Sequence, residues 1–586
     1  MGIAGEADAP DMAWHERAEL QPDFVESRLR RYLAGRAPAA GGALKLANRI
    51  AFIGEGQLCD DLGCFAEVTA LRPGGPAVPA DLLLIAGDWP RAGDPWREAL
   101  LNASPAATAR LRETIARYRS QGVPAALWVT GEAETAGAFL HLKDAVDAVF
   151  VPAGADVPGA QVLEPFVNVK LFNPFSENAQ SRADAAYFRF AVDGVHELSR
   201  LGAPEAVLEL VKPFLKFNSW LIDSSYHYQV ANMKLAAACR RRFIGHVGHA
   251  ERAALLKMVS GLYLPSALAA RRPVSFRKRA LEAQASKALV FSDGDGPADG
   301  ILRFQDAAQL EALLDRVRQD EVGAMVRAHR AWRDAVSHHT VFERLETILA
   351  AVKVTPVYNQ PPRPRVNVVM PTLRPEHIPF ALEMFRSQTW RETALTIVAN
   401  GVQVPEPIVR QIRETPGASL CAVPQDKTIG YCMNFGIDRA DADYWAKWDD
   451  DDVYGPHILE DQMLQRKYLD FDVAGKAAIF NYIEERDGVF VRDFAVRDTV
   501  SRHLGGGTLL VRNLGRYFAE DGRGAEDRAF LHLARERGDR IVSGDPFNFM
   551  QVRRKDSSTH TWARGPRLQD LRGPERRGLS LDGIIV

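Results

Sequence analysis

The stretch YWAKWDDDD (Tyr444–Asp452) joins a short aromatic run to four consecutive aspartates, and a Gly-Pro turn follows it. The pattern predicts a buried strand whose end places the aspartates at the carboxyl edge of a parallel sheet, where ligands bind in α/β proteins. In an extended chain alternate side chains share a face, so we expect Asp449 and Asp451 to point one way and Asp450 and Asp452 the other.

Carboxylates this close together repel one another unless a cation compensates them. A hard divalent ion with oxygen ligands, Mn²⁺ or Mg²⁺, is the natural partner, and it keeps positions open for diphosphate oxygens. For an acidic run taken alone, a solvated loop is the alternative. The position directly after a strand favours a functional site.

Two apolar runs before this stretch extend the α/β pattern. NVVMPT (Asn367–Thr372) and LTIVAN (Leu395–Asn400) are predicted strands that flank a helix at Ile378–Gln388. A helix around Tyr431–Ala440 leads into the aromatic strand. Short apolar strands that alternate with helices predict a parallel sheet.

Three segments of this region resemble family 2 glycosyltransferases of the GT-A fold. VNVVMPTLRPEHIPFALEMFRSQTW (Val366–Trp390) resembles the family's opening strand, Pro-Thr loop and helix, and IGYCMNFGIDRADADYWAKWDDDD (Ile429–Asp452) resembles the stretch that ends in its aspartates. GAEDRAFLHLARERGDRIV (Gly524–Val542) is similar to its Glu-Asp helix. The three occur in order over about 180 residues. The resemblance implies metal-dependent transfer, with inversion, of a sugar from a nucleotide diphosphate to a hydroxyl acceptor.

The resemblance gives roles to the residues at matching positions. The side chains that it places at the donor are Pro371, Thr372, Arg374, Asn400, Asn434, Asp449 and Asp450. Asp449 and Asp451 would form the family's Asp-x-Asp pair, with Asp451 on the metal. The family resemblance favours a UDP-sugar as the donor. Asn400 stands where the family usually has an aspartate that contacts uridine, and this departure leaves the identity of the base open.

Glu526 and Asp527 begin the third segment. The resemblance makes Asp527 the general base that takes the proton of the acceptor hydroxyl, while Glu526 helps to position that hydroxyl. Taken alone, the two residues also fit an ordinary acidic first turn of a helix, which the helix dipole favours.

Two further features lie near these segments. His560, in DSSTHTW (Asp556–Trp562), lies where some relatives of the family place a histidine on the metal, and a surface histidine is the alternative. The glycines Gly505–Gly507 allow close backbone approach to the sugar or the acceptor, or form only a tight bend.

The residues before this domain show two more series of alternating strands and helices. The first starts at RIAFIG (Arg49–Gly54) and includes DLLLIAG (Asp81–Gly87), and the second resumes at RFIGHVG (Arg242–Gly248) after a mainly helical pattern at about 185–239. PVYNQPPRPR (Pro356–Arg365) then marks the clearest domain boundary, because proline neither continues a helix nor joins a central strand.

This N-terminal half resembles GT-B glycosyltransferases of the spore-maturation-protein type. The segments that carry the resemblance are ALWVTGEAE (Ala126–Glu134), DAVFVPAG (Asp147–Gly154) and SFRKRALEAQASKALVFSD (Ser275–Asp293). The resemblance places Arg279 and Glu282 at a nucleotide-sugar donor, but Ser286-Lys287 stands where the family usually has a glycine. A second active site and a degenerate scaffold or acceptor-binding module both stay open.

The expected fold is α/β and multi-domain, with a GT-B-like pair of Rossmann-type units followed by a GT-A domain. The parts are a partly helical leader at 1–47, Rossmann-type units at 48–190 and 191–355, a Pro-rich linker at 356–364, the GT-A domain at 365–565 and a loosely ordered tail at 566–586.

Composition narrows the partners and the compartment. A formal net charge of −2 gives no case for nucleic-acid binding, and five scattered cysteines fit neither a zinc site nor a disulfide framework. Neither a signal peptide nor an apolar run of the roughly 20 residues that span a bilayer is recognised. We therefore expect a cytoplasmic protein, at most peripheral to the inner membrane, that acts on a surface glycan or polysaccharide. The oligomeric state stays open.

Two rival functions use some of the same features. A nucleotidyl- or phosphotransferase also holds Mg²⁺ with acidic clusters, but neither a P-loop nor a Gly-rich nucleotidyltransfer loop is recognised. A non-catalytic carbohydrate-binding or assembly protein fits the N-terminal half better than the C-terminal one, because it leaves the acidic run and the Glu-Asp helix unexplained.

Overall fold

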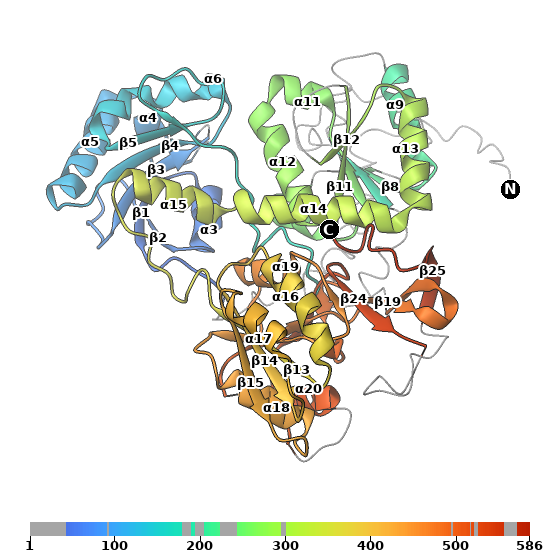
Figure 1. Ribbon diagram of the computed structural model, residues 1–586. Coiled ribbons are helices and arrows are strands. Elements are labelled where there is room, and N and C mark those ends of the chain that lie inside the picture. Colours follow the sequence, from blue (N-terminus) through green and yellow to red (C-terminus); the bar gives the residue numbers. More distant parts are fainter. Residues whose placement is uncertain are drawn as a thin grey trace. The chain divides into compact units, whose positions relative to one another are not determined.

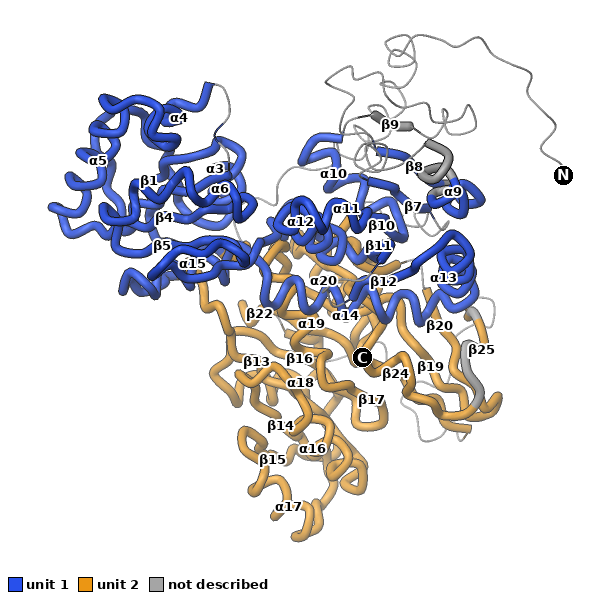
Figure 2. The backbone as a smooth tube through the Cα atoms, turned by 90° about the horizontal axis from the view of Figure 1, so that it is seen from above, with its two compact units in different colours: residues 1–37, 45–174, 184–357 blue, residues 38–44, 175–183, 358–586 orange. Residues whose placement is uncertain are grey.

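The computed structural model divides the chain into two compact units (Figure 2). Unit 1 comprises residues 1–37, 45–174 and 184–357, and unit 2 comprises residues 38–44, 175–183 and 358–586. The structure describes residues 43–88, 90, 93–177, 189–193, 204–222, 243–245, 247–294, 300–493, 496–515, 517–520, 526–555 and 571–586.

The first sheet of unit 1 is parallel, with strand order β2-β1-β3-β4-β5-β6. Its central strands β3 and β4 are buried along their whole length, as expected for a sheet covered by helices on both faces. The strands are β1 (Arg49–Gly54), β2 (Glu67–Ala70), β3 (Leu82–Gly87), β4 (Ala125–Val129), β5 (Ala148–Val151) and β6 (Gln161–Val162). The helices between them are α3 (Gly56–Gly63), α4 (Arg97–Leu100), α5 (Pro105–Ser120), α6 (Ala133–Ala136) and the 3₁₀ segment η1 (Gly137–Ala145).

The second sheet of unit 1 is also parallel, with strand order β12-β11-β10-β7-β8-β9. Its strands are β7 (Arg189–Val192), β8 (Asn218–Ile222), β9 (Phe243–Gly245), β10 (Gly261–Tyr263), β11 (Leu289–Asp293) and β12 (Ile301–Phe304). Its helices are α9 (Pro204–Leu215), α10 (His249–Leu256), α11 (Ser266–Arg271), α12 (Pro273–Ala285), α13 (Ala307–Gln319) and α14 (Glu321–His338).

The structure corrects the expected helical pattern at about 185–239. Two strands, β7 and β8, lie in this region and pair with each other, so the expected boundary between residues 190 and 191 cuts through β7. The reason is that β7 is a short apolar run in the middle of the sheet, where burial and pairing with β10 override local helix propensity.

Helix α15 (Val341–Ala351) returns from the second sheet to the first, although the sequence assigns it to the second α/β unit (Figure 1). The ring of Phe342 packs edge-on against Phe65, with centroids 5.0 Å apart. Arg344 donates to the backbone carbonyls of Glu164 and Pro165. Thr340 and Glu343 form a capping box that starts the helix at this crossing. These contacts fix α15 to the first half of unit 1.

The larger sheet of unit 2 has strand order β15-β14-β13-β16-β22-β18-β23-β21. Strands β13 to β16 are parallel, and β22 pairs with β16 in the antiparallel sense. The strands are β13 (Val366–Thr372), β14 (Thr393–Asn400), β15 (Ala418–Val423), β16 (Tyr444–Lys447), β18 (Val473–Gly475), β21 (Thr499–Val500), β22 (Leu510–Arg512) and β23 (Ile541–Ser543). The helical segments are η5 (Pro375–His377), α16 (Ile378–Arg386), α17 (Glu406–Arg413), α18 (Ile429–Ile437), α19 (Ile458–Leu464), η6 (Gln465–Lys467), η7 (Glu484–Arg486), η8 (Gly506–Thr508) and α20 (Glu526–Glu536).

A second sheet of unit 2 shows that the expected loose tail is wrong. The strands β17 (Val453–Tyr454), β24 (Phe549–Arg553), β19 (Ile479–Ile483), β20 (Gly488–Arg492) and β25 (Leu571–Arg577) pair in that order. Strand β25 lies in the tail and pairs antiparallel with β20. Beyond it, Ile584 and Val586 are buried, and Val586 N–H donates to Asn548 Oδ1 over 3.0 Å. The Arg, Gly and Pro content of this segment suggests a loose tail. The buried side chains of Ile584 and Val586 hold it against the unit.

The chain is thus a multi-domain α/β protein with two parallel sheets in unit 1 and two mixed sheets in unit 2. Among the described residues, no helix has the length and apolar character needed to cross a membrane.

Candidate functional site

The acidic turn of unit 2 lies where the strand order of its parallel sheet reverses. Strand β13 pairs with β14 on one side and with β16 on the other, so the chain runs outward to β15 and then returns to the other side of β13. Ligands of open α/β sheets bind at such switch points, outside the carboxyl ends of the strands. The predicted Pro371-Thr372 pair ends β13, and the four aspartates come just after its neighbour β16.

Asp450 and Asp451 form ion pairs with an arginine from the loop after β13. The guanidinium of Arg374 contacts Asp450, and its Nη2 lies 3.1 Å from Asp451 Oδ2. Thr372 adds a hydrogen bond from its hydroxyl to Asp450. Asp450 is buried, and a buried carboxylate needs an opposite charge beside it. Arg374 supplies that charge, and the ion pair in turn holds the arginine in place. Pro371 is half-buried at the end of β13, next to this pair.

The expected alternation of the four aspartates is wrong, because the chain turns at residues 450–452 and is not extended there. A Cβ placed on Gly507 would lie 2.9 Å from Asp449 Oδ2 and 3.3 Å from Asp452 Oδ2, so these two carboxylates face the same backbone segment. Burial, and after it the charges of Asp449 and Asp451, raises the pKa of Asp452 well above its ordinary value. The turn therefore gathers its carboxylates more closely than a strand would.

Lys447 connects the acidic turn to the Glu-Asp helix. Its Nζ lies 2.6 Å from Asp449 Oδ1 and 3.4 Å from Asp527 Oδ2. Asp527 is 80 positions after Lys447 in the chain. The sequence motifs do not single out Lys447, although a lysine inside a short aromatic strand is a usable signal. A lysine in a buried strand needs an acidic partner.

Asp527 lies in the first turn of α20, and Glu526 precedes it at the first position of the helix. Burial raises the pKa of Asp527, and the charge of Asp449 adds to that rise, while the ammonium of Lys447 opposes it. Asp527 Oδ2 faces Lys447, whereas the buried Oδ1 has no hydrogen-bond partner in the described part of the chain. The two predicted acidic motifs, distant in sequence, therefore meet through one ammonium.

The glycine run gives the backbone room beside both motifs. A Cβ on Gly506 would lie 1.9 Å from Asp527 Oδ2, which leaves no space for any side chain. The same atom on Gly507 would lie 2.8 Å from the hydroxyl of Tyr454, which accepts the backbone N–H of Asp449. The backbone of these glycines therefore lies close to the acidic side chains of the site.

Two predicted donor residues already make hydrogen bonds within the protein. Both amide hydrogens of Asn434 are donated, to Phe518 O and Glu520 Oε1, and its oxygen accepts Phe518 N–H, so Asn434 fixes the loop at 517–520. Asn400 ends β14 and donates to Lys427 O over 3.1 Å. The geometry thus favours a structural role for Asn434. His560 lies outside the described residues.

In unit 1, the two predicted donor residues form buried ion pairs. Glu282 on α12 is 1% exposed and lies 3.2 Å from Arg252 Nη1 on α10. Arg279, one turn earlier, lies 3.2 Å from the buried carboxylate of Asp193. Both charges are therefore already compensated within the protein.

Two carboxylates of the first half of unit 1 contact the second half. Glu132 accepts hydrogen bonds from Val274 N–H and Ser275 N–H, both at 2.9 Å, at the N-terminus of α12. Asp61 lies 3.3 Å from His249 Nε2 on α10. Burial opposes ionisation of Asp61, but its hydrogen bonds to His249 and Asn168 outweigh that effect and lower its pKa. Glu132 supplies the negative charge that a helix N-terminus favours.

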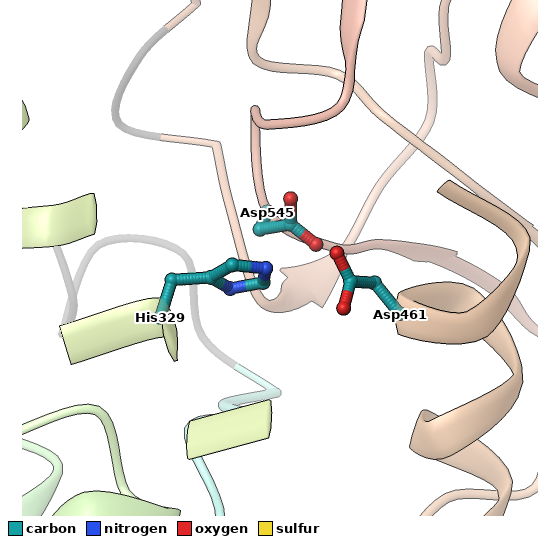
Figure 3. A group of neighbouring side chains, drawn as sticks. All are labelled: His329, Asp461 and Asp545. Carbon is teal, nitrogen blue, oxygen red and sulfur yellow. The ribbon is translucent and has the colours of Figure 1, made fainter. Parts of the chain in front are cut away.

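A second acidic pair of unit 2 is formed by residues outside the acidic turn (Figure 3). Asp461 on α19 and Asp545 after β23 direct their carboxylates toward each other, and both are buried. Lys476 Nζ lies 3.0 Å from Asp545 Oδ1, and Asn548 donates to Asp461 over 2.9 Å. His329, also drawn in Figure 3, is a residue of unit 1. These partners explain the pair as part of the interior of unit 2.

No protein-family model matches the sequence, and no curated protein matches it. Among solved structures, residues 1–349 of TarS from S. aureus in complex with UDP-GlcNAc are 16% identical, with a TM-score of 0.27, over 33% of this chain and 59% of that chain. The mannosyltransferase PcManGT from Pyrobaculum calidifontis in complex with GDP-Man and Mn²⁺ is 18% identical, with a TM-score of 0.27, over 40% of this chain and 70% of that chain. The match thus spans less than two thirds of the TarS fragment, and likeness at this level does not identify a family.

Proposed function

We propose that unit 2 is a metal-dependent glycosyltransferase domain that moves a sugar from a nucleotide-diphosphate donor to a hydroxyl of a glycan or polysaccharide. One observation carries the proposal. The acidic turn and the Glu-Asp helix, which the sequence assigns to donor and acceptor chemistry, meet at Lys447 at the switch point of the sheet.

The residues of the acidic turn fit a divalent ion. They offer oxygen ligands only, from Asp449, Asp451 and Asp452, and such ligands suit Mn²⁺ or Mg²⁺. Arg374 and Lys447 offset part of the negative charge, and the carboxylates outnumber these two cations. We assign Asp449 and Asp451 as metal ligands, with His560 as a third candidate. The ion, when bound, would neutralise charge on the departing diphosphate.

Asp527 is the proposed general base. The acceptor oxygen attacks the anomeric carbon, the bond from that carbon to the diphosphate oxygen breaks, and the acceptor proton passes to the Asp527 carboxylate. Attack on the face opposite the leaving group inverts the configuration. The partly exposed carboxylate of Asp527 is the group for this proton, and Glu526 beside it would position the acceptor.

The donor would lie over the carboxyl ends of β13 and β14. Thr372 ends β13, Arg374 lies in the loop after it, and Asn400 ends β14, so the diphosphate would lie nearer Arg374 and the base nearer Asn400. A UDP-sugar is the first donor to test. Nucleotides with other bases are tested as well, because Asn400 is a neutral amide where the family usually has an aspartate.

For unit 1 the contacts favour a scaffold or acceptor-binding role over a second active site. The oxygens of Glu282 face Arg252 and His249, at 3.2 Å and 3.9 Å. Glu132 already occupies the N-terminus of α12, a position where a helix can bind an anion. A donor would have to displace both sets of contacts.

The test is donor turnover by the purified protein with UDP-, GDP-, CMP- and dTDP-sugars, with Mn²⁺ and with chelator, alongside Asp451→Asn and Glu282→Ala. We expect metal-dependent release of one nucleotide that Asp451→Asn loses and Glu282→Ala keeps. Full activity in chelator would refute the metal assignment. A metal-independent turnover lost only in Glu282→Ala would instead place a second active site in unit 1.

A further inference from the structure

Lys447 is a buried cation in the middle of the larger sheet of unit 2. Its side chain is 6% exposed, and its ammonium contacts one carboxylate from the acidic turn and one from α20. These are Asp449 Oδ1 at 2.6 Å and Asp527 Oδ2 at 3.4 Å. One ammonium thus joins the carboxylate assigned to the metal to the carboxylate assigned to the acceptor.

The sheet explains why the ammonium reaches both groups. Alternate side chains of a strand share a face, so Trp445 and Lys447 of β16 point to the same side. Trp445 packs on Phe530 of α20, with ring centroids 5.3 Å apart. Phe530 lies one turn after Asp527, so Lys447, two residues beyond Trp445, lies beneath the first turn of that helix.

Neighbouring groups restrict the carboxylate of Asp527 further. Gly506 leaves no space beside Oδ2, because a Cβ there would lie 1.9 Å from it. With Oδ2 held between Lys447 and the Gly506 backbone, Oδ1 is the oxygen without a hydrogen-bond partner in the described structure. Packing alone does not require this arrangement, since an apolar side chain of the same length would fill the space under α20 without burying a charge.

We propose that Lys447 is a positioning residue of the transferase site: it holds the carboxylate of Asp527 through Oδ2 and thereby fixes the place of that base relative to Asp449. The inference rests on the proposed function, because it takes Asp527 as the base. It adds a residue that acts through two others and does not itself touch the reacting atoms.

The experiment is a double-mutant cycle on the full-length protein with Lys447→Met, Asp527→Asn and the double variant. Methionine keeps the stem and removes the ammonium. Transfer kcat, donor KM, and donor affinity by calorimetry in Mn²⁺ are measured for each. Lys476→Met serves as the matched control, because Lys476 is another fully buried lysine of unit 2 that pairs with one aspartate, Asp545, outside the proposed site. If Lys447→Met fails to fold, Lys447→Gln, which keeps an N–H donor, replaces it in the same cycle.

We expect Lys447→Met to lower kcat about 10²-fold, within the range of a lost general base, with donor affinity changed less than about threefold. The double variant should be no slower than Asp527→Asn alone, because both changes remove the same function. Independent, multiplicative losses, or a Lys447→Met kcat no lower than that of Lys476→Met, would overturn the positioning role while the wild type still turns over donor. A wild type that neither binds nor turns over any donor would refute the proposed function and this inference with it.

Discussion

Asp527 is the residue on which the proposed chemistry depends most directly. Asp527→Asn keeps the shape and the contact with Lys447 but cannot take a proton. We expect sugar transfer to fall about 10²–10⁴-fold, the usual contribution of a general base, while donor binding by calorimetry stays close to wild type. Asp426→Asn is the control, because Asp426 is a surface carboxylate with a 3.7 Å contact to Lys427. Loss of donor binding together with the fold would instead make Asp527 structural.

Gly506 tests the same carboxylate from the backbone side. Gly506→Ala places a methyl group 1.9 Å from Asp527 Oδ2, so the carboxylate must move away from Lys447. Transfer should fall at least tenfold. Gly505→Ala is the matched change one residue earlier, where the nearest atom would be Lys476 O at 3.4 Å, an ordinary contact. Equal rates for the two alanine variants, measured at saturating donor, would show that the position of Asp527 does not limit the reaction.

At the scale of single elements, the N-terminus of α12 depends on a carboxylate from the other half of unit 1. Glu132→Ala removes the acceptor of Val274 N–H and Ser275 N–H. Loss of such a cap costs about 1 kcal/mol, so hydrogen exchange of these two amides should speed up about fivefold. Glu134→Ala, which changes an exposed residue in the first turn of the adjoining helix α6, should leave their exchange unchanged. Unchanged exchange in Glu132→Ala would show that this contact does not hold α12.

The junction of α14 and α15 predicts an acid-sensitive step in unit 1. Burial, and then the charges of Arg277 and Arg344, lowers the pKa of His339 from 6.5 to about 4. Between these values the unfolded chain binds a proton that the folded chain does not, so stability falls as the pH drops from 6.5 toward 4. Partial exposure limits the loss to about 1–3 kcal/mol.

His339→Gln removes this titration while it keeps an amide for the two arginines. The difference in denaturation midpoint between pH 7 and pH 4.5 should therefore be smaller in the variant than in the wild type. Carboxylates that titrate in the same window affect both proteins alike, so the comparison isolates His339. An unchanged difference would mean that His339 has the same pKa in the folded and unfolded chains.

For the whole molecule, local pattern predicted the elements better than their partners. Strands β13, β14 and β16 and helix α16 were predicted because apolar runs of the right length determine them. Strands β7 and β25 were missed, because they depend on pairing with distant strands. At the site, the two acidic motifs were identified from the sequence. The Arg374–Asp450 pair and the position of Lys447 follow from tertiary packing, which no local pattern encodes.

The same limit applies to the predicted domain boundaries. Unit 2 includes a segment from far earlier in the chain, at residues 175–183. Ser176 N–H donates to Asp498 O over 3.0 Å, and Thr499 donates to Ser176 O over 2.7 Å, so Ser176 continues the sheet beside β21. Phe175 is buried in the unit, and Arg540 lies over its ring at 5.5 Å. A boundary drawn at the proline-rich linker removes these contacts.

A fragment of residues 358–586 should therefore be less stable than the same unit in the full chain. Loss of the buried Phe175 ring alone costs about 2 kcal/mol, and the hydrogen bonds of Ser176 add to that. Fusing residues 175–183 to the fragment through a flexible linker should recover most of the denaturation midpoint, whereas the same fusion with Phe175→Ala should not. If the unfused fragment is as stable as the fused one, the segment is peripheral to unit 2. Recovery of donor turnover with the fused segment would show that β21, at the edge of the sheet, and the acidic turn after β16 fold as one cooperative unit.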